Sequence, residues 1–192
     1  MQNTSINYSL YAITAPAANL TTQVQQAIDG GITMLQIREK NCTTKRLIEL
    51  AYPILNLCRN AGIPCIIDDD VEAARVLGAD GVHVRQRDMK VQQAREILGD
   101  KAIIGTSAHN VAEAVAAEKA GATYLGCGAV FHTSTKHDAT LLPYAVLCDI
   151  RKAVCIPVVA IGGITAHNIP QLYSSGIDGV AVVSAVFGQP DV

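Results

Sequence analysis

The chain alternates eight short apolar segments with segments of helical pattern along almost its whole length. The apolar segments are rich in Val, Ile and Ala, and few of them alternate apolar with polar residues, which is typical of parallel strands covered on both faces. We predict strands over Ser9–Thr14, Thr33–Glu39, Pro64–Asp68, Gly81–Val84, Ala102–Ser107, Tyr124–Val130, Pro157–Ile161 and Gly179–Ser184. Three junctions between a helix and the next strand repeat one pattern, a glycine followed almost at once by the strand, at Gly78, Gly121 and Gly176. This recurrence indicates a repeated βα unit.

Eight such units predict an α/β protein of the (β/α)8 TIM barrel type, with residues 1–192 forming one domain. The alternative is an open doubly wound sheet, but no G-x-G-x-x-G motif follows the first predicted strand. Only Val186–Val192 lie beyond the first residues after the eighth strand, so we expect the last helix to be truncated or missing. We expect this to leave an apolar surface near the closure of the barrel, which a partner subunit of a homo-oligomer could cover.

The composition excludes several classes of protein. Hydrophobic residues make up 49% of the 192 residues and the net charge is −2, which excludes a disordered chain and gives no support for nucleic-acid binding. No apolar run approaches the roughly 20 residues that span a bilayer, and Met1–Ser9 does not resemble a signal peptide. The six cysteines form no CxxC pair and no Cys/His metal spacing. We interpret them as free thiols in a reducing compartment and expect a cytoplasmic protein.

In a barrel of this type the functional residues lie at the C-terminal ends of the strands, and polar residues gather there in this sequence. Gln36, Arg38 and Lys40 stand at alternate positions along the end of the second predicted strand and the residue that follows it, so these three side chains share one face. Because both faces of the strand are expected to be covered, the three polar groups must point at something. Two cations and an amide in a covered space predict an anion, and a phosphate suits them best.

Three consecutive carboxylates, Asp68, Asp69 and Asp70, end the third predicted strand. They repel one another, so we expect a cation close to them. Asp69 and Asp88 come from neighbouring strand ends and could share Mg²⁺, which favours a few carboxylates together with substrate phosphates. Asp70 is instead predicted to be the N-cap of a helix over Val71–Leu77, and a similar N-cap role is the alternative for Asp88.

Two further segments suit phosphate groups. Thr133-Ser134-Thr135-Lys136 combines hydroxyls with a cation, although an ordinary solvated loop is the alternative. Gly162-Gly163 and Val183-Ser184 follow the last two strands, where barrels often bind phosphate through backbone N–H groups. A tight turn is the alternative for Gly163. Together with the second strand, these segments predict more than one bound phosphate group.

The five histidines form no Ser/His/Asp arrangement and no metal-binding pair. His83 alternates with Val82 and Val84 in a predicted strand, and we interpret it as a packed core residue. The remaining histidines lie in predicted loops and are interpreted as structural or surface residues.

In their order and spacing, these motifs resemble the thiamine phosphate synthase family, and the resemblance covers almost the whole chain. It is carried by Tyr11-Ala12-Ile13-Thr14, Gln36-Ile37-Arg38-Glu39-Lys40, Ile67-Asp68-Asp69, Gly81-Val82-His83, Gln86-Arg87-Asp88, Gly105-Thr106-Ser107, Thr133-Ser134-Thr135-Lys136, Ile161-Gly162-Gly163-Ile164-Thr165 and Val182-Val183-Ser184-Ala185. Each motif is modest alone, and the combination is specific.

The resemblance implies an enzyme that joins a hydroxymethylpyrimidine diphosphate to a thiazole phosphate, giving thiamine phosphate and pyrophosphate. It implies Mg²⁺ as the cofactor, held by Asp69 and Asp88. It implies Lys136, Arg38 and Ser107 as catalytic residues. The residues that it implies to contact the two phosphorylated substrates are Gln36, Arg38, Lys40, Asp68, Ser107, Thr133, Ser134, Thr135, Lys136, Gly163, Val183 and Ser184.

The chain departs from the family pattern at four positions. The family usually has Asn at Asp68, Gly and Glu in place of Arg85 and Arg87, and Pro in place of His132. A carboxylate at Asp68 adds negative charge where a diphosphate is expected, and the Coulomb cost at about 4 Å could reach a few kcal/mol at an effective dielectric constant near 20. A bound proton, a place in the Mg²⁺ shell or a nearby arginine would relieve this cost. We expect Arg85 or Arg87 to do so.

Two other functions stay open at this point. The thiazole tautomerases share the barrel and lack the coupling activity, and a non-catalytic barrel that binds a phosphorylated metabolite would need no Mg²⁺. The presence of Asp69, Asp88, Thr133, Thr135 and Lys136 favours the synthase. Mg²⁺-dependent release of pyrophosphate would distinguish it from both.

Overall fold

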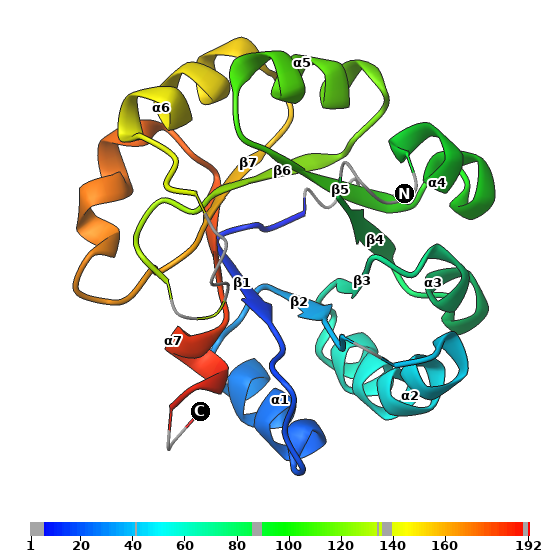
Figure 1. Ribbon diagram of the computed structural model, residues 1–192. Coiled ribbons are helices and arrows are strands. Elements are labelled where there is room, and N and C mark those ends of the chain that lie inside the picture. Colours follow the sequence, from blue (N-terminus) through cyan, green and yellow to red (C-terminus); the bar gives the residue numbers. More distant parts are fainter. Residues whose placement is uncertain (1–5, 41, 86–89, 134, 136–139, 190–191) are drawn as a thin grey trace.

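The structure is a computed structural model that describes residues 6–40, 42–85, 90–133, 135, 140–189 and 192. Its elements are β1 (Leu10–Ile13), α1 (Leu20–Asp29), β2 (Met34–Ile37), α2 (Thr44–Ala61), β3 (Cys65–Asp68), α3 (Val71–Leu77), β4 (Gly81–Val84), α4 (Val91–Leu98), β5 (Ile103–Ala108), α5 (Val111–Lys119), β6 (Tyr124–Gly128), α6 (Tyr144–Ala153), β7 (Val158–Ile161), the 3₁₀ helix η1 (Ile169–Ser175), β8 (Gly179–Val182) and α7 (Ser184–Phe187). The strands pair in parallel in chain order, and β8 pairs with β1 to close the barrel. Figure 1 shows the helices as a ring around the strands. The predicted (β/α)8 barrel is confirmed, and the open doubly wound sheet is wrong.

Strand register divides each strand into residues that face the barrel interior and residues that face the helices. Tyr11 pairs with Met34 and Ile66 with Gly81, and these positions face inward. The inner cluster consists of Tyr8, Tyr11, Ile13, Met34, Ile66, Ile103, Tyr124, Val159 and Ala181. Alternate residues such as Leu35 and Leu125 pack outward, in the two larger clusters that the helices cover. Side chains therefore fill the interior of the barrel and helices cover its outer face, as the apolar strands predicted.

Glycine occupies inner positions of three neighbouring strands, β4, β5 and β6, and leaves room for large side chains. A Cβ atom at Gly105 would collide with the ring of Tyr124, which is completely buried. A Cβ atom at Gly126 would lie 3.2 Å from Cε1 of His83. These glycines allow Tyr124 and His83 to lie inside a barrel whose interior is otherwise closely packed.

The end of the chain is close to what the sequence predicted, with one correction. Among residues 184–189 and 192, only the four-residue helix α7 follows β8, beside α1 (Figure 1). Phe187 of α7 is buried in the same apolar cluster as Leu20 and Val24 of α1. The expected apolar surface near the barrel closure is therefore not found in the described residues. Within the described ranges, the large apolar side chains that are exposed are Tyr52, Val76, Ile97, Val111, Leu141, Tyr144 and Tyr173, and none of them belongs to α1 or α7.

No helix within the described ranges combines the length and the apolar character that crossing a bilayer requires.

The fit of Tyr124 against Gly105 leads to a test. We expect Gly105→Ala to lower the free energy of unfolding by about 1–3 kcal/mol, because the added methyl group must displace a ring inside a packed barrel. Urea denaturation followed by circular dichroism measures the change. Gly30→Ala, at the end of α1 with a φ of −74°, is the matched control and should change stability by about 0.5 kcal/mol or less. An equal loss of unfolding free energy in the two variants would show that the barrel interior accommodates an added methyl group without strain.

Candidate functional site

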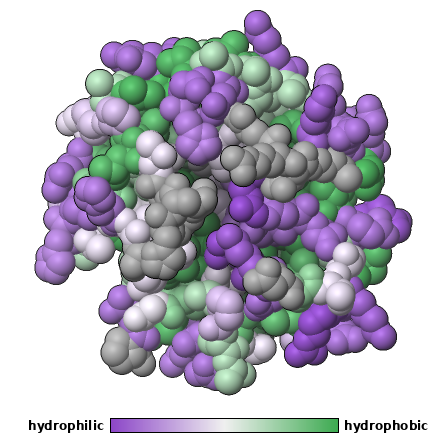
Figure 2. Space-filling view, viewed as in Figure 1, coloured by the Kyte–Doolittle hydropathy of each residue, from purple (hydrophilic) through white to green (hydrophobic). Residues whose placement is uncertain are grey.

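A cavity of about 260 Å³ opens at the C-terminal ends of the strands. All eight strands, or the residues that follow them, contribute to its lining, as a site in a TIM barrel requires. Figure 2 shows hydrophilic side chains gathered near the centre of the face where the barrel opens. The cavity is thus polar at its mouth, although the barrel around it is apolar.

The structure brings most of the predicted site residues together around this cavity. Those that line it are Gln36, Arg38, Asp68, Ser107, Thr133, Thr135, Gly163, Val183 and Ser184. Lys40 is exposed and does not line the cavity, and Asp69 lies just outside the lining. Asp88, Ser134 and Lys136 lie outside the described residues. The roles assigned to all of these residues stay predictions.

The end of β2 is positioned by β1. The backbone N–H of Thr14 donates to the carbonyl of Gln36 at 2.9 Å, and the N–H of Arg38 donates to Oγ1 of Thr14 at 2.9 Å. These bonds extend the pairing past the last residue of the strand, so Arg38 keeps the inward orientation of Gln36. Gln36 is 3% exposed, so its amide is committed to partners inside the barrel.

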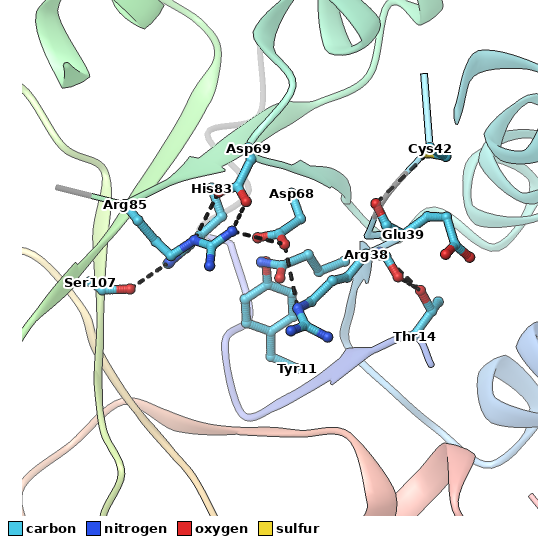
Figure 3. Close-up of polar contacts among 11 residues, drawn as sticks. Tyr11, Thr14, Arg38, Glu39, Cys42, Asp68, Asp69, His83, Arg85 and Ser107 are labelled. Atoms are coloured by element: carbon cyan, nitrogen blue, oxygen red, sulfur yellow. Dashed lines mark hydrogen bonds and ion pairs between the residues drawn. The ribbon is translucent and has the colours of Figure 1, made fainter. Parts of the chain in front are cut away.

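Two arginines and two aspartates form an ionic cluster at the mouth of the cavity (Figure 3). Nε of Arg38 lies 3.5 Å from Oδ2 of Asp68, and Nη2 of Arg85 lies 3.9 Å from the same oxygen. Arg85 also binds both carboxylate oxygens of Asp69, with Nε donating to Oδ1 at 3.0 Å. The cation predicted beside the aspartates is therefore present. Arg85, one of the two expected arginines, contacts both Asp68 and Asp69, and Arg38 also lies beside Asp68. Arg87, the other candidate, lies outside the described residues.

The backbone after β3 turns sharply to aim these carboxylates. Asp69 has a φ of 62°, a left-handed conformation that Asp adopts more readily than most residues. Its N–H donates to the carbonyl of His83 at 2.9 Å, which ties the turn to β4. Asp68 and Asp69 consequently both face Arg85 (Figure 3).

The third carboxylate, Asp70, is the N-cap of α3, as the sequence predicted. Its Oδ1 accepts from the N–H of Ala73 at 2.8 Å, and its Oδ2 accepts from Oγ1 of Thr44 at 2.7 Å. Both oxygens are therefore used to begin one helix and to join it to the start of α2. Asp70 is structural and takes no part in the ionic cluster.

A chain of polar side chains crosses the floor of the cavity. Nε2 of Gln36 donates to Oη of Tyr11 at 2.7 Å, and Tyr11 and Tyr124 share a hydrogen bond of 2.9 Å between their hydroxyls. Oη of Tyr124 lies 3.0 Å from Nδ1 of His83, whose Nε2 lies 3.1 Å from Oγ of Ser107. Burial raises the pKa values of Tyr11 and Tyr124 far above the usual range, so both hydroxyls stay protonated.

This chain contains residues that the sequence analysis did not find. His83 is not simply a packed core residue, because both ring nitrogens have polar partners and the ring lines the cavity. Tyr11 and Tyr124 were not singled out at all. The sequence did contain a signal for them. Both tyrosines stand at those alternate positions of their strands whose side chains point into the barrel, and the other residues of these strands are apolar or small.

The opposite side of the cavity is built from loops after β6, β7 and β8. Gly163 has a φ of 64°, and a Cβ atom there would collide with the carbonyl of His132. Nδ2 of Asn168 donates to the carbonyl of Gly163 at 2.8 Å, and its Oδ1 accepts from the N–H of Thr165 at 2.8 Å. The loop after β7 thus needs glycine and is held by a side chain from the start of η1. Gly163 makes a turn, as the alternative proposed, and it also lines the cavity.

Comparisons with known proteins agree with this geometry. The family described as thiamine monophosphate synthase matches residues 10–186. The thiamine-phosphate synthase of Clostridium acetobutylicum is 41% identical over 95% of this chain and 88% of its own length, and that of Chloroflexus aurantiacus is 44% identical over 97% and 88%. The solved structure of a thiamine phosphate pyrophosphorylase from Pyrococcus furiosus is 39% identical, covers 97% of this chain and 91% of its own, and superposes with a TM-score of 0.90.

The N-cap role of Asp70 can be separated from the role of its neighbours. We expect Asp70→Ala to lower the free energy of unfolding by about 1 kcal/mol, because the N–H of Ala73 loses its acceptor. Asp70→Asn should restore most of the loss, since an amide oxygen caps a helix about as well as a carboxylate. Thermal or urea denaturation of the three proteins measures both effects. A loss in Asp70→Asn as large as in Asp70→Ala would mean that the second carboxylate oxygen, through its charge or its bond from Oγ1 of Thr44, matters more than the cap.

Proposed function

Because the chain belongs to the thiamine monophosphate synthase family, we propose that it joins a hydroxymethylpyrimidine diphosphate to a thiazole phosphate, releasing pyrophosphate. The observation that carries this proposal is a single cavity with guanidinium groups on one side and the loops after β6, β7 and β8 on the other. Two phosphorylated substrates can therefore bind with their reacting ends facing each other.

The pyrimidine diphosphate binds on the side formed by β2, β3, β4 and β5. Arg38 and Arg85 are the described cations of the lining, and Gln36 and Ser107 are neutral groups deeper in the same wall. Arginine suits a diphosphate because its planar guanidinium donates two parallel hydrogen bonds. The charged end of this substrate consequently lies at the mouth, and its ring lies over the polar floor.

The thiazole phosphate binds on the opposite side, near Gly163, Val183 and Ser184. Glycine at position 163 lets a phosphate approach the backbone closely, and a side chain there would not fit. Thr133 and Thr135, from the loop after β6 on this side, also line the cavity and add hydroxyl groups. Ser134 and Lys136, predicted to act with them, lie outside the described residues.

The reaction needs little covalent chemistry from the protein. The carbon–oxygen bond to the diphosphate breaks, the leaving group keeps the electron pair, and the thiazole nitrogen forms the new carbon–nitrogen bond. Arg38 stabilises the charge that develops on the leaving diphosphate, and Ser107 holds the pyrimidine in place. The two bound substrates would fill much of the cavity and limit the access of water, which would otherwise capture the pyrimidine cation.

We propose Mg²⁺ as the cofactor, with Asp69 and Asp88 as its ligands. The oxygen donors suit Mg²⁺, but the described residues include no group of three or more His, Cys, Asp or Glu side chains that could hold a metal ion. Both oxygens of Asp69 are bound by Arg85, so Arg85 competes with a cation for this carboxylate. When bound, Mg²⁺ would neutralise charge on the leaving diphosphate.

The remaining proposals concern the surroundings of the enzyme. Its partners are the two small phosphorylated substrates. We propose the cytoplasm as its compartment, which is supported by the free cysteines, including the buried Cys58, Cys65 and Cys127.

The direct test of the function is to incubate the purified protein with both substrates and to follow thiamine phosphate and pyrophosphate by chromatography. We expect both products in equal amounts, formed only when Mg²⁺ is present. Ser107→Ala should reduce the rate by at least about tenfold, because a positioning contact in the cavity is lost. Isomerisation of the thiazole without coupling would instead indicate a tautomerase, and binding without turnover would indicate a sensor.

Competition between Arg85 and Mg²⁺ for Asp69 gives a second test, which needs no turnover. We expect Arg85→Gln to bind Mg²⁺ about tenfold more tightly than the wild type in titration calorimetry without substrate, a difference of about 1.4 kcal/mol. Arg38→Gln removes the same charge from the cluster but leaves Asp69 bound to Arg85, so it is the matched control. An equal gain in both variants would mean that only net charge matters, and no gain in either would remove Asp69 as a ligand.

A further inference from the structure

Five polar side chains from five different strands form one continuous hydrogen-bonded chain, Gln36–Tyr11–Tyr124–His83–Ser107. The first four are no more than 9% exposed, and Tyr124 is completely buried. A buried donor without an acceptor is unfavourable, so each proton along such a chain needs a partner. The chain therefore has a direction, which can be found by following one proton at a time.

The direction begins at Gln36, whose amide nitrogen donates to Oη of Tyr11. Tyr11 has a single proton, and within the described residues its only other partner is the hydroxyl of Tyr124. Tyr124 in turn has one proton to give, and Nδ1 of His83 is its remaining neighbour. In a neutral imidazole one nitrogen accepts while the other carries the proton. The proton of His83 is thus on Nε2, which donates to Oγ of Ser107.

The opposite direction would need the amide of Gln36 turned over. Its carbonyl oxygen would then accept a hydrogen bond from Tyr11. The donor and the acceptor would exchange in every other bond of the chain, and the Ser107 hydroxyl would donate to Nε2 of His83. The direction therefore depends on which end of the Gln36 amide faces Tyr11. Nε2 stands 2.7 Å from Oη of Tyr11, which gives the first direction, and the His83 tautomer measured below tests this orientation. The raised pKa values of both tyrosines keep the two phenolic protons in place as pH changes. Ser107 therefore receives a hydrogen bond from inside the barrel and has its own proton left over.

We propose that Tyr11, Tyr124 and His83 are positioning residues that hold His83 as its Nε2–H tautomer, so that the Ser107 hydroxyl donates its proton to an acceptor atom of the bound substrate ring. The chemical class of this acceptor is an unprotonated nitrogen of a heteroaromatic ring. The identity of that ring as the pyrimidine rests on the proposed function, whereas the tautomer and the polarity of Ser107 are properties of the substrate-free protein.

The test is ¹⁵N NMR of histidine-labelled protein without substrate, because the two ring nitrogens have distinct shifts in each tautomer. The His83 signals are assigned by their loss in His83→Gln. We expect the wild type to show the Nε2–H tautomer and Tyr124→Phe to show a mixture of tautomers. Tyr8→Phe is the matched control, because the Tyr8 ring lies 5.3 Å from that of Tyr124 while its buried hydroxyl has no hydrogen-bond partner within the described residues. It should leave the tautomer unchanged.

Kinetics give an independent measure of the same link. Tyr124→Phe should lower kcat/KM for the pyrimidine diphosphate about three- to tenfold, the effect of one neutral hydrogen bond, and leave the KM of the thiazole phosphate unchanged. Should Tyr124→Phe fail to fold, Tyr11→Phe interrupts the chain one bond earlier and should also mix the tautomers. An Nδ1–H or doubly protonated His83 in the wild type, or an unchanged tautomer in the folded variant, would overturn the proposal. A wild type with the expected tautomer but no product would overturn the proposed function and leave the hydrogen-bonded chain standing.

Discussion

Closure of eight parallel strands leaves a narrow interior, and what fills it determines the rest of the site. Tyr11 and Tyr124 occupy the space below the cavity, and Gly105 supplies the room that Tyr124 needs. A barrel filled only by aliphatic side chains would present an apolar floor to its ligands. Here the two hydroxyls meet and connect Gln36 of β2 with His83 of β4. The same two tyrosines therefore fill the core of the barrel and make the floor of the site polar.

Electrostatics shape the mouth of the cavity in a different way. Asp68 and Asp69 face Arg38 and Arg85, so the charges of these four residues balance before any substrate arrives. The side chain of Asp68 is only 9% exposed, and a carboxylate so deeply buried needs a cation close by. The same contacts hold the guanidinium groups beside the place where a diphosphate binds. A diphosphate that takes over these arginines must therefore compete with carboxylates, and a cation bound at the aspartates would favour that exchange.

Much of the fold could be predicted because the signals are local. Parallel strands covered on both faces are continuous apolar runs, and Gly78 and Gly176 end their elements in left-handed conformations that glycine favours. The cavity residues at the end of β2 could be predicted because side chains alternate between the two faces of a strand. The N-cap at Asp70 could be predicted because Asp is a preferred residue at that position. The role of His83 could not be found in this way, because its partners Tyr124 and Ser107 are 41 and 24 residues away in the sequence. The pairing of Asp69 with Arg85 could not be predicted either, because it depends on how the backbone turns after β3.

The neutral chain on the floor and the ionic cluster at the mouth are linked by Asp68. Burial is the main cause of the raised pKa values of Tyr11 and Tyr124, and the negative charge of Asp68 raises both further. A carboxylate at this position therefore opposes ionisation of the phenols and favours the state in which each hydroxyl keeps one proton to donate. An amide at the same position would remove that field while leaving the packing intact. The departure at Asp68 is thus compatible with a working site, since Arg38 and Arg85 balance its charge at the mouth while its field acts on the floor.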